Sequence, residues 1–143
     1  MPAIGWDSVT VPGAVSAWVE LSRRFGVLPF GELFGPAIEY ARRGYPVSPF
    51  IARTWREASE KYRAFGSFVD TFLPQGRAPH PGELFTFPNA AGTLEEIADT
   101  FGESFYRGRL AGAIARFALE TGGLLQEEDL GAHRADWVEP MSI

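Results

Sequence analysis

The 143-residue sequence contains no cysteine, a single lysine, two histidines and two methionines. The lack of cysteine excludes disulfides, thiolate catalysis and cysteine-ligated zinc, although it does not identify a redox compartment. No apolar run reaches the roughly 18–20 residues of a transmembrane helix, so no membrane span is predicted. The first six residues carry neither a basic nor a long apolar segment, and no export signal is expected there.

Basic charge is also scarce, since 13 basic side chains stand against 18 acidic ones and the formal net charge is −5. Such a chain lacks the basic face that nucleic acids require, so no nucleic-acid partner is expected. Most basic residues stand near acids at helical spacing, so we interpret them as solvated, ion-paired helix faces and not as a phosphate-binding patch. The expected pairs are Glu20–Arg24, Glu39–Arg43, Glu57–Lys61 and Glu103–Arg107.

Glycine and proline are abundant, with 16 and 11 residues, and they fall between segments of helical apolar period. The sequence therefore predicts a mainly α fold of short helices in one domain, residues 1–143. The expected helices cover residues 13–25, 29–43, 49–65, 90–101 and 109–121, with short helical pieces around 105–106 and 126–130. The apolar side chains expected in the core are Trp18, Phe34, Ile38, Leu94, Ile97 and Ile114.

The helical period breaks between residues 66 and 88. Two short apolar pieces, 71–73 and 84–87, flank a segment rich in glycine and proline, which predicts a small β-hairpin. The C-terminal segment 137–143 alternates like a strand, but one short hairpin cannot supply it with a sheet. We therefore expect this strand to be loosely ordered or paired with another copy, and the chain to be an incomplete piece of a larger fold.

No residue pattern indicates a catalytic, cofactor-binding or metal site. His80 and His133 lack a second ligand at metal-binding spacing and are interpreted as structural or exposed. The acidic runs 127–129 and 95–96 are interpreted as helix starts, where carboxylates suit the helix dipole. The sequence contains no Gly-x-Ser-x-Gly elbow, Walker loop or His-Glu-x-x-His motif. No catalytic residue, cofactor or metal is therefore predicted.

A series of short motifs nevertheless carries a specific resemblance. In chain order they are residues 8–15 (Ser-Val-Thr-Val-Pro-Gly-Ala-Val), 24–26 (Arg-Phe-Gly), 28–29 (Leu-Pro), 33–34 (Leu-Phe), 36–38 (Pro-Ala-Ile), 41–47 (Ala-Arg-Arg-Gly-Tyr-Pro-Val), 93–98 (Thr-Leu-Glu-Glu-Ile-Ala), 105–108 (Phe-Tyr-Arg-Gly), 122–124 (Gly-Gly-Leu) and 129–130 (Asp-Leu). Together they resemble part of the large subunit of the γ-glutamyltransferase (glutathione hydrolase) family. Two positions depart from the family pattern: Leu125 stands where Thr or Ser usually caps the next helix, and His133 where Tyr is common.

The resemblance implies a piece of an αββα N-terminal-nucleophile hydrolase fold. In that family a precursor cleaves itself, and the threonine that opens the small subunit attacks γ-glutamyl amides, with its amino group as the base. The implied partners are the rest of the large subunit, the small catalytic subunit and a γ-glutamyl substrate such as glutathione. The family suggests a periplasmic or extracellular location, and a cytoplasmic one stays open.

The resemblance carries no catalytic residue onto this chain. The substrate-binding arginine and the catalytic threonine of the family have no counterpart among residues 1–143, and none of the seven threonines stands at the family's cleavage motif. The expectation is therefore that the chain alone is inactive. Two alternatives remain: an acylase or amidohydrolase on the same scaffold, or a catalytically inactive helical binding module.

Overall fold

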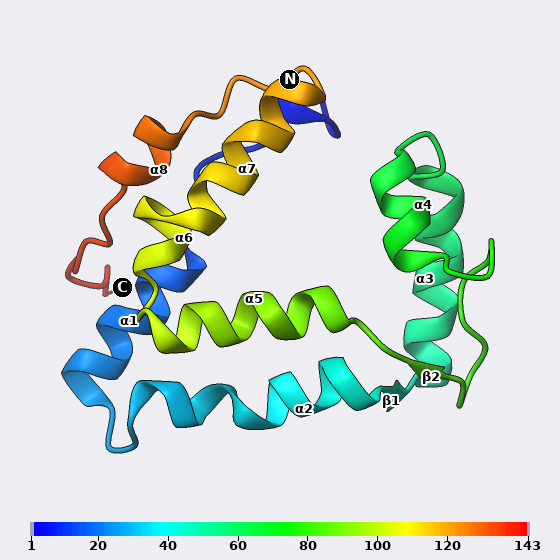
Figure 1. Ribbon diagram of the computed structural model, residues 1–143, viewed down its shortest axis with the longest axis horizontal. Coiled ribbons are helices and arrows are strands. Elements are labelled where there is room, and N and C mark those ends of the chain that lie inside the picture. The colour runs from blue at the N-terminus through cyan, green and yellow to red at the C-terminus, as the bar shows by residue number, and fades with distance from the viewer. Residues whose placement is uncertain (1, 143) are drawn as a thin grey trace. The chain divides into compact units, whose positions relative to one another are not determined.

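The computed structural model describes residues 2–142 and consists of two compact units. Unit 1 comprises Met1–Phe34 and Thr93–Ile143, and unit 2 comprises Gly35–Gly92. Helices predominate in both, as the sequence predicts (Figure 1). In chain order the elements are η1 (Trp6–Ser8), α1 (Ala14–Phe25), η2 (Phe30–Phe34), α2 (Gly35–Arg43), β1 (Tyr45–Pro46), α3 (Pro49–Lys61), α4 (Gly66–Phe72), β2 (Leu84–Phe85), α5 (Pro88–Asp99), α6 (Glu103–Arg107), α7 (Arg109–Glu120) and α8 (Glu127–Ala132).

Unit 1 is held together by apolar side chains from segments far apart in the sequence. Helix α6 packs on α7 and α8, which follow it in the chain (Figure 1). The larger buried side chains of this unit are Val15, Val19, Phe30, Phe34, Ile97, Tyr106, Leu110 and Leu130. They come from α1, η2, α5, α6, α7 and α8, so the core of unit 1 requires both of its sequence segments.

The N-terminal segment lies against the C-terminal end of α7. The indole Nε1 of Trp6 donates a hydrogen bond of 2.8 Å to Thr121 Oγ1, and the Trp6 ring lies 6.1 Å from that of Phe117. Gly123 approaches the Trp6 ring so closely that a Cβ atom at this position would collide with it. A glycine is therefore required where the chain leaves α7.

The single helix expected over 29–43 is wrong, because the segment forms two elements. A 3₁₀ helix, η2, precedes α2, and Pro36 lies in the first turn of α2. Proline has no N–H to donate to the preceding turn, so an α-helix does not continue through this position. The fourth helix also begins earlier than expected: α5 starts at Pro88, which places Asn89 inside the first turn and not at the cap.

The core of unit 2 is an aromatic cluster between α3, α4 and β2. Ser48 caps α3 by accepting the N–H of Ile51 at 3.3 Å, and Pro49 occupies the first turn, as the sequence predicts. The Trp55 ring packs edge-on against Phe85 at 4.6 Å, and its Nε1 donates to the carbonyl of Phe72 at 3.1 Å. The end of α4 is thus joined to α3.

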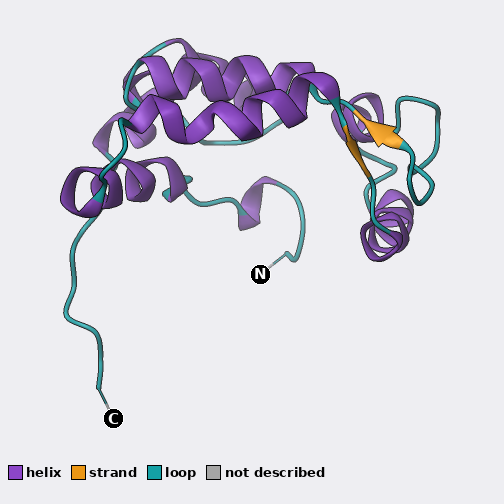
Figure 2. Cartoon of the chain, turned by 90° about the horizontal axis from the view of Figure 1, so that it is seen from below, coloured by secondary structure: helices purple, strands orange, loops and turns teal. Residues whose placement is uncertain are grey.

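The β-hairpin expected between 71–73 and 84–87 is wrong in one of its strands. The antiparallel partner of β2 is β1, with Tyr45 opposite Phe85 and Pro46 opposite Leu84 (Figure 2). Residues 71–72 belong instead to α4. A short apolar run fits either a strand or a buried helix, and here the contacts of Phe72 with Trp55 favour the helix.

Gly44 connects α2 to β1 in a conformation that other residues rarely adopt. Its φ is +88°, and a Cβ atom would lie 3.0 Å from Thr86 Cγ2 and 3.2 Å from the carbonyl oxygen of Phe85. Both the backbone angle and the lack of space require glycine, which allows β1 to pair with β2 directly after the helix.

The C-terminal strand expected at 137–143 is not formed over the described residues 137–142, which have no regular structure (Figure 2). Residue 143 lies outside the described range. The Trp137 ring packs edge-on against Phe25 at 5.6 Å, and the Arg24 guanidinium lies 4.3 Å above it. Side-chain contacts with α1, and not strand pairing, therefore hold this part of the tail.

The expected ion pairs form in two of four cases. Glu39–Arg43 and Glu103–Arg107 are present at 3.0 and 3.2 Å. Glu20 instead pairs with Arg23, and Glu57 with Arg53. The spacing of acid and base along a helix allows both i,i+3 and i,i+4 partners, so spacing alone does not select between them.

The expected core is also confirmed only in part. Phe34 and Ile97 are buried, Ile38, Leu94 and Ile114 are half-buried, and Trp18 is 44% exposed. Helix α1 turns Val15 and Val19 toward the interior, and the Trp18 ring meets Phe34 only at an edge, 6.1 Å away. The buried face of α1 is therefore narrower than its apolar pattern indicates.

Phe34→Ala is expected to lower the free energy of unfolding by about 3–5 kcal/mol, because it removes a buried ring that packs on Phe30 at 4.9 Å. The neighbouring Leu33→Ala is the matched control, because Leu33 is 49% exposed, and it should cost less than about 1 kcal/mol. Urea denaturation of both variants measures the difference. Equal losses for the two would contradict this placement of η2.

Candidate functional site

A buried polar cluster in unit 1 is built around the hydroxyl of Tyr106, whose side chain is 5% exposed. The hydroxyl donates a hydrogen bond to the carbonyl of Pro12 at 2.7 Å and accepts one from the N–H of Ser16 at 3.0 Å. The Ser16 N–H belongs to the first turn of α1, where N–H groups lack helical partners, and Pro12 precedes the cap residue Gly13. Tyr106 thus fixes the start of α1 from 90 residues further along the chain.

His133 completes this cluster. Its ring stacks on Tyr106 at 5.2 Å with an interplanar angle of 23°, and its Nε2 lies 2.9 Å from Ser16 Oγ. A serine beside a histidine resembles the nucleophile and base of a hydrolase, so the direction of the hydrogen bond decides the chemistry. Ser16 Oγ gives its single proton to the carbonyl of Gly13 at 2.8 Å. With the serine proton on the Gly13 carbonyl, the tautomer of His133 that carries its proton on Nε2 donates to Ser16.

A second polar network joins α5, α6 and α7. The Glu96 carboxylate accepts hydrogen bonds from the Ser104 hydroxyl and from the Arg109 guanidinium, whose Nε lies 2.9 Å from Glu96 Oε2. The Arg109 guanidinium, followed by the Ser104 hydroxyl, holds the pKa of Glu96 below its ordinary value. The carboxylate therefore acts as an ionised structural link and not as a proton donor.

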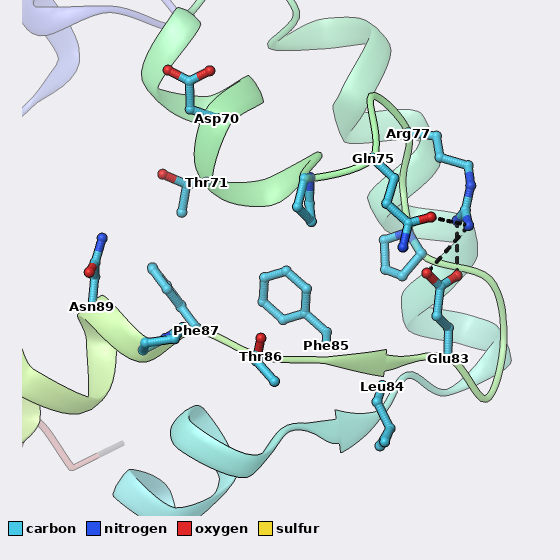
Figure 3. Close-up of a pocket in the computed structure, with 13 residues that line it drawn as sticks. Asp70, Thr71, Gln75, Arg77, Glu83, Leu84, Phe85, Thr86, Phe87 and Asn89 are labelled. Carbon is cyan, nitrogen blue, oxygen red and sulfur yellow. Dashed lines mark hydrogen bonds and ion pairs between the residues drawn. The ribbon is translucent and has the colours of Figure 1, made fainter.

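Unit 2 contains a cavity of about 580 Å³ with an aromatic floor and a polar rim. The Phe85 and Phe87 rings lie between α4 and β2, and a hydrogen-bonded group of Gln75, Arg77 and Glu83 lies at one end (Figure 3). Arg77 contacts Glu83 at 2.9 Å and Gln75 at 2.7 Å. Hydrogen bonds from Arg77, and then from the His80 backbone N–H, lower the pKa of Glu83. These polar groups satisfy one another and leave no activated nucleophile at the cavity.

The residues that the sequence singled out lie apart from one another. His80 is an exposed loop residue in unit 2, while His133 is half-buried in unit 1. Asp129 caps α8 by accepting the Gln126 N–H at 2.9 Å, so the helix-start role is confirmed for this acidic run. It is wrong for 95–96, which lie in the second half of α5. Position 125 is not the cap, since Gln126 has that role.

Two other kinds of feature, a metal-binding cluster and a membrane-spanning helix, are absent from the described residues. Within residues 2–142, no three His, Asp or Glu side chains gather at a distance suited to a metal ion. Over the same residues, no helix combines the length and the hydropathy of a membrane span. The Tyr106 cluster was missed from the sequence because its partners are about 90 to 117 residues apart, and no local spacing links them.

Comparison with known proteins identifies the family of this chain. The sequence pattern of the Gamma-glutamyltranspeptidase family matches residues 1–143. The chain belongs to this family. The family resemblance predicted from the short motifs is therefore confirmed.

The proteins to which the chain is similar carry more than one name. It is 34% identical to a glutathione hydrolase-like proenzyme of Bacillus subtilis over 143 residues, 99% of this chain and 27% of the relative. A solved cephalosporin acylase from Bacillus halodurans superposes with a TM-score of 0.96 at 45% identity, covering 100% of this chain and 28% of that one. A γ-glutamyltranspeptidase from Pseudomonas nitroreducens superposes with a TM-score of 0.89 at 35% identity, over 97% and 40%.

These comparisons confirm the fold class and leave much of the relatives unmatched. The chain is a mainly α part of the N-terminal-nucleophile hydrolase fold of the γ-glutamyltranspeptidases. It spans about a quarter of the length of the curated relatives that it matches. About three quarters of the length of these relatives therefore has no counterpart in residues 1–143.

Tyr106→Phe is expected to lower the free energy of unfolding by about 1–3 kcal/mol, because it leaves the Ser16 N–H and the Pro12 carbonyl without their partner. Tyr62→Phe is the control, since the Tyr62 ring packs on Phe68 at 5.4 Å while its hydroxyl makes no hydrogen bond among the described residues. That substitution should change the free energy by less than about 0.5 kcal/mol. Chemical denaturation measures the free energy of unfolding of both variants. Equal losses for the two would contradict the role of the Tyr106 hydroxyl in holding the start of α1.

Glu96→Gln is expected to lower the melting temperature at neutral pH and to matter less in acid. Because the pKa of Glu96 is depressed in the fold, its ionised form contributes stability that is present above the ordinary value of 4.5. That contribution is lost as the pH falls through the lowered pKa. Melting curves from pH 7 to pH 3 should therefore converge for wild type and variant.

The matched control for this pH series is Glu120→Gln, at an exposed helix position without an ion pair among the described residues. Its melting temperature should follow that of the wild type at every pH. A difference between Glu96→Gln and wild type that stays constant from pH 7 to pH 3 would show that the ionised Glu96 carboxylate is not the stabilising species.

Proposed function

We propose that this chain is part of an enzyme that cleaves γ-glutamyl amides and transfers the acyl group to water or to an amino acid. The membership of residues 1–143 in the γ-glutamyltranspeptidase family is the observation that carries the proposal. The nucleophile is an N-terminal threonine outside these residues, and the partners are the rest of the large subunit and the small catalytic subunit. The substrate is a γ-glutamyl compound such as glutathione.

The threonines of the chain support a nucleophile elsewhere. An N-terminal nucleophile uses its own free amino group as the base, and an internal threonine gains that group only when the chain is cleaved directly before it. None of the seven threonines stands at the family's cleavage motif. Thr54, Thr100 and Thr121 also donate their hydroxyl protons to helix carbonyls, at 3.0, 2.6 and 2.6 Å. Their protons are thus held by the backbone, and no general base lies beside them.

Exposed apolar side chains of unit 1 support the proposed partners. Val27 is 96% exposed and Leu28 58% exposed, in the turn between α1 and η2. Phe25 and Leu21, on α1, are at least half exposed as well. Apolar side chains gathered in this way are typical of surfaces that another protein segment covers. We infer that the remainder of the enzyme packs on this part of unit 1.

A different acyl group is the second candidate, because the cephalosporin acylase of Bacillus halodurans has 45% identity to this chain. Acylase and γ-glutamyl transfer share the same attack on an amide and differ in the groups that recognise the acyl chain. A γ-glutamyl anilide carries an α-amino group that the corresponding glutaryl anilide lacks. The ratio of kcat/KM for these two substrates therefore separates the two activities in the full-length enzyme.

The 143-residue chain alone is expected to release no p-nitroaniline from γ-glutamyl-p-nitroanilide above the uncatalysed rate, while the full-length enzyme turns it over. The same preparation of the full-length enzyme, tested on glutaryl-p-nitroanilide, is the specificity arm. Faster turnover of the glutaryl compound would favour the acylase. Turnover by the 143-residue chain, free of host enzyme, would contradict the placement of the nucleophile, and inactivity of the full-length protein on both would favour a binding module.

A further inference from the structure

One face of α3 carries a row of arginines toward a groove in unit 2. Arg53, Arg56, Glu60 and Arg63 stand at i, i+3, i+7 and i+10, which is the spacing of a single helix face continued into the turn after α3. The loop Gly76–Pro81 forms the opposite wall. Between them lies a cavity of about 370 Å³.

The positive charge in this groove is not compensated locally. The guanidinium groups of Arg56 and Arg63 make no ion pair or hydrogen bond with any other described residue, and Glu60 is the acid that lines the groove with them. Arg53 is paired with Glu57 at 3.9 Å, so Arg56 and Arg63 carry the unpaired positive charge of the groove. Arg77, on the opposite wall, is already paired with Glu83.

Four arginines outside the groove are paired with acids. Arg23, Arg43 and Arg107 pair with acids of their own helices, and Arg109 pairs with Glu96 of a different one. Unit 2 carries seven basic and five acidic side chains, a net charge of +2, whereas the remaining residues carry six and thirteen, a net charge of −7. A groove of uncompensated arginines in an acidic chain concentrates anions locally.

We propose that the groove between α3 and the loop Gly76–Pro81 binds a small polyanion, a molecule with two or more carboxylate or phosphate groups. Arg56 and Arg63 are seven residues apart, roughly 10 Å along the helix direction, so each can hold a separate anionic group. A guanidinium presents a planar pair of donors that matches both carboxylate and phosphate. The volume of about 370 Å³ accommodates a ligand of this size.

The interpretation of the arginines as solvated, ion-paired faces is therefore replaced at this one place. An i,i+4 acid pairs with Arg43 and Arg107, but the acid four residues after Arg56 leaves its guanidinium unpaired. Arg56 and Arg63 repel each other across the groove, and a bound polyanion relieves that repulsion. The arginines lie together because the i, i+3, i+7, i+10 spacing directs their side chains to the same side of α3.

Isothermal titration of the 143-residue chain at low ionic strength tests this binding with two polyanions, pyrophosphate and citrate. At least one is expected to bind saturably at one site, and added sodium chloride should weaken the affinity. The double substitution R56Q/R63Q should weaken it at least ten-fold. The control R43Q/R116Q removes the same charge from exposed helix positions outside the groove and should change the affinity less than two-fold.

A substitution that is expected to strengthen binding distinguishes a change at the site from loss of the fold, because an unfolded variant cannot bind more tightly. Glu60→Gln removes the groove's carboxylate and should tighten binding at least two-fold, with circular dichroism confirming unchanged helix content in every variant. Binding of pyrophosphate alone would identify a phosphate ligand, and binding of citrate alone a polycarboxylate. No saturable binding of either, or equal losses in R56Q/R63Q and R43Q/R116Q, would overturn the site.

Discussion

The buried hydroxyl of Tyr106 is the contact on which unit 1 depends. It satisfies two backbone groups at the start of α1, and its ring supports His133 beyond the end of α8. A single side chain of α6 therefore joins the first helix of the chain to the last. Tyr106 is 5% exposed, so the loss of its hydroxyl leaves the Ser16 N–H and the Pro12 carbonyl without the partner that the fold supplies.

Several polar side chains of the chain are held by backbone carbonyls or by ion pairs. The serine beside His133 and three threonines give their protons to backbone carbonyls, and Glu96 and Glu83 are held ionised by arginines. Groups fixed in this way stabilise helix ends and helix contacts, but they neither attack an amide nor exchange protons near neutral pH. These groups therefore act as structural contacts, which fits the proposal that the nucleophile lies outside residues 1–143.

Local sequence rules predicted most helices and few of the contacts. Ser48–Pro49 at the start of α3 and the glycine at the end of α2 marked their boundaries, because caps and positive φ depend on neighbouring residues. The strand pairing was wrong because β1 contains a proline and is only two residues long. The Tyr106 cluster could not be predicted, because only the folded chain brings together residues that are 90 to 117 positions apart. A turn-rich segment was expected between 73 and 84, but its position opposite the arginines of α3 depends on the fold.

The division of the chain also has a consequence for the order of folding during synthesis. Unit 2 is continuous in sequence, whereas unit 1 joins Met1–Phe34 to Thr93–Ile143. Ribosomes add roughly 5–20 residues per second, so the first helix waits several seconds for the tyrosine that fixes its start. During that interval Val15 and Val19 have no completed core to enter, and unit 2 is free to form first. In a nascent chain stopped before residue 106, unit 2 should therefore resist proteolysis, whereas residues 1–34 should be cleaved.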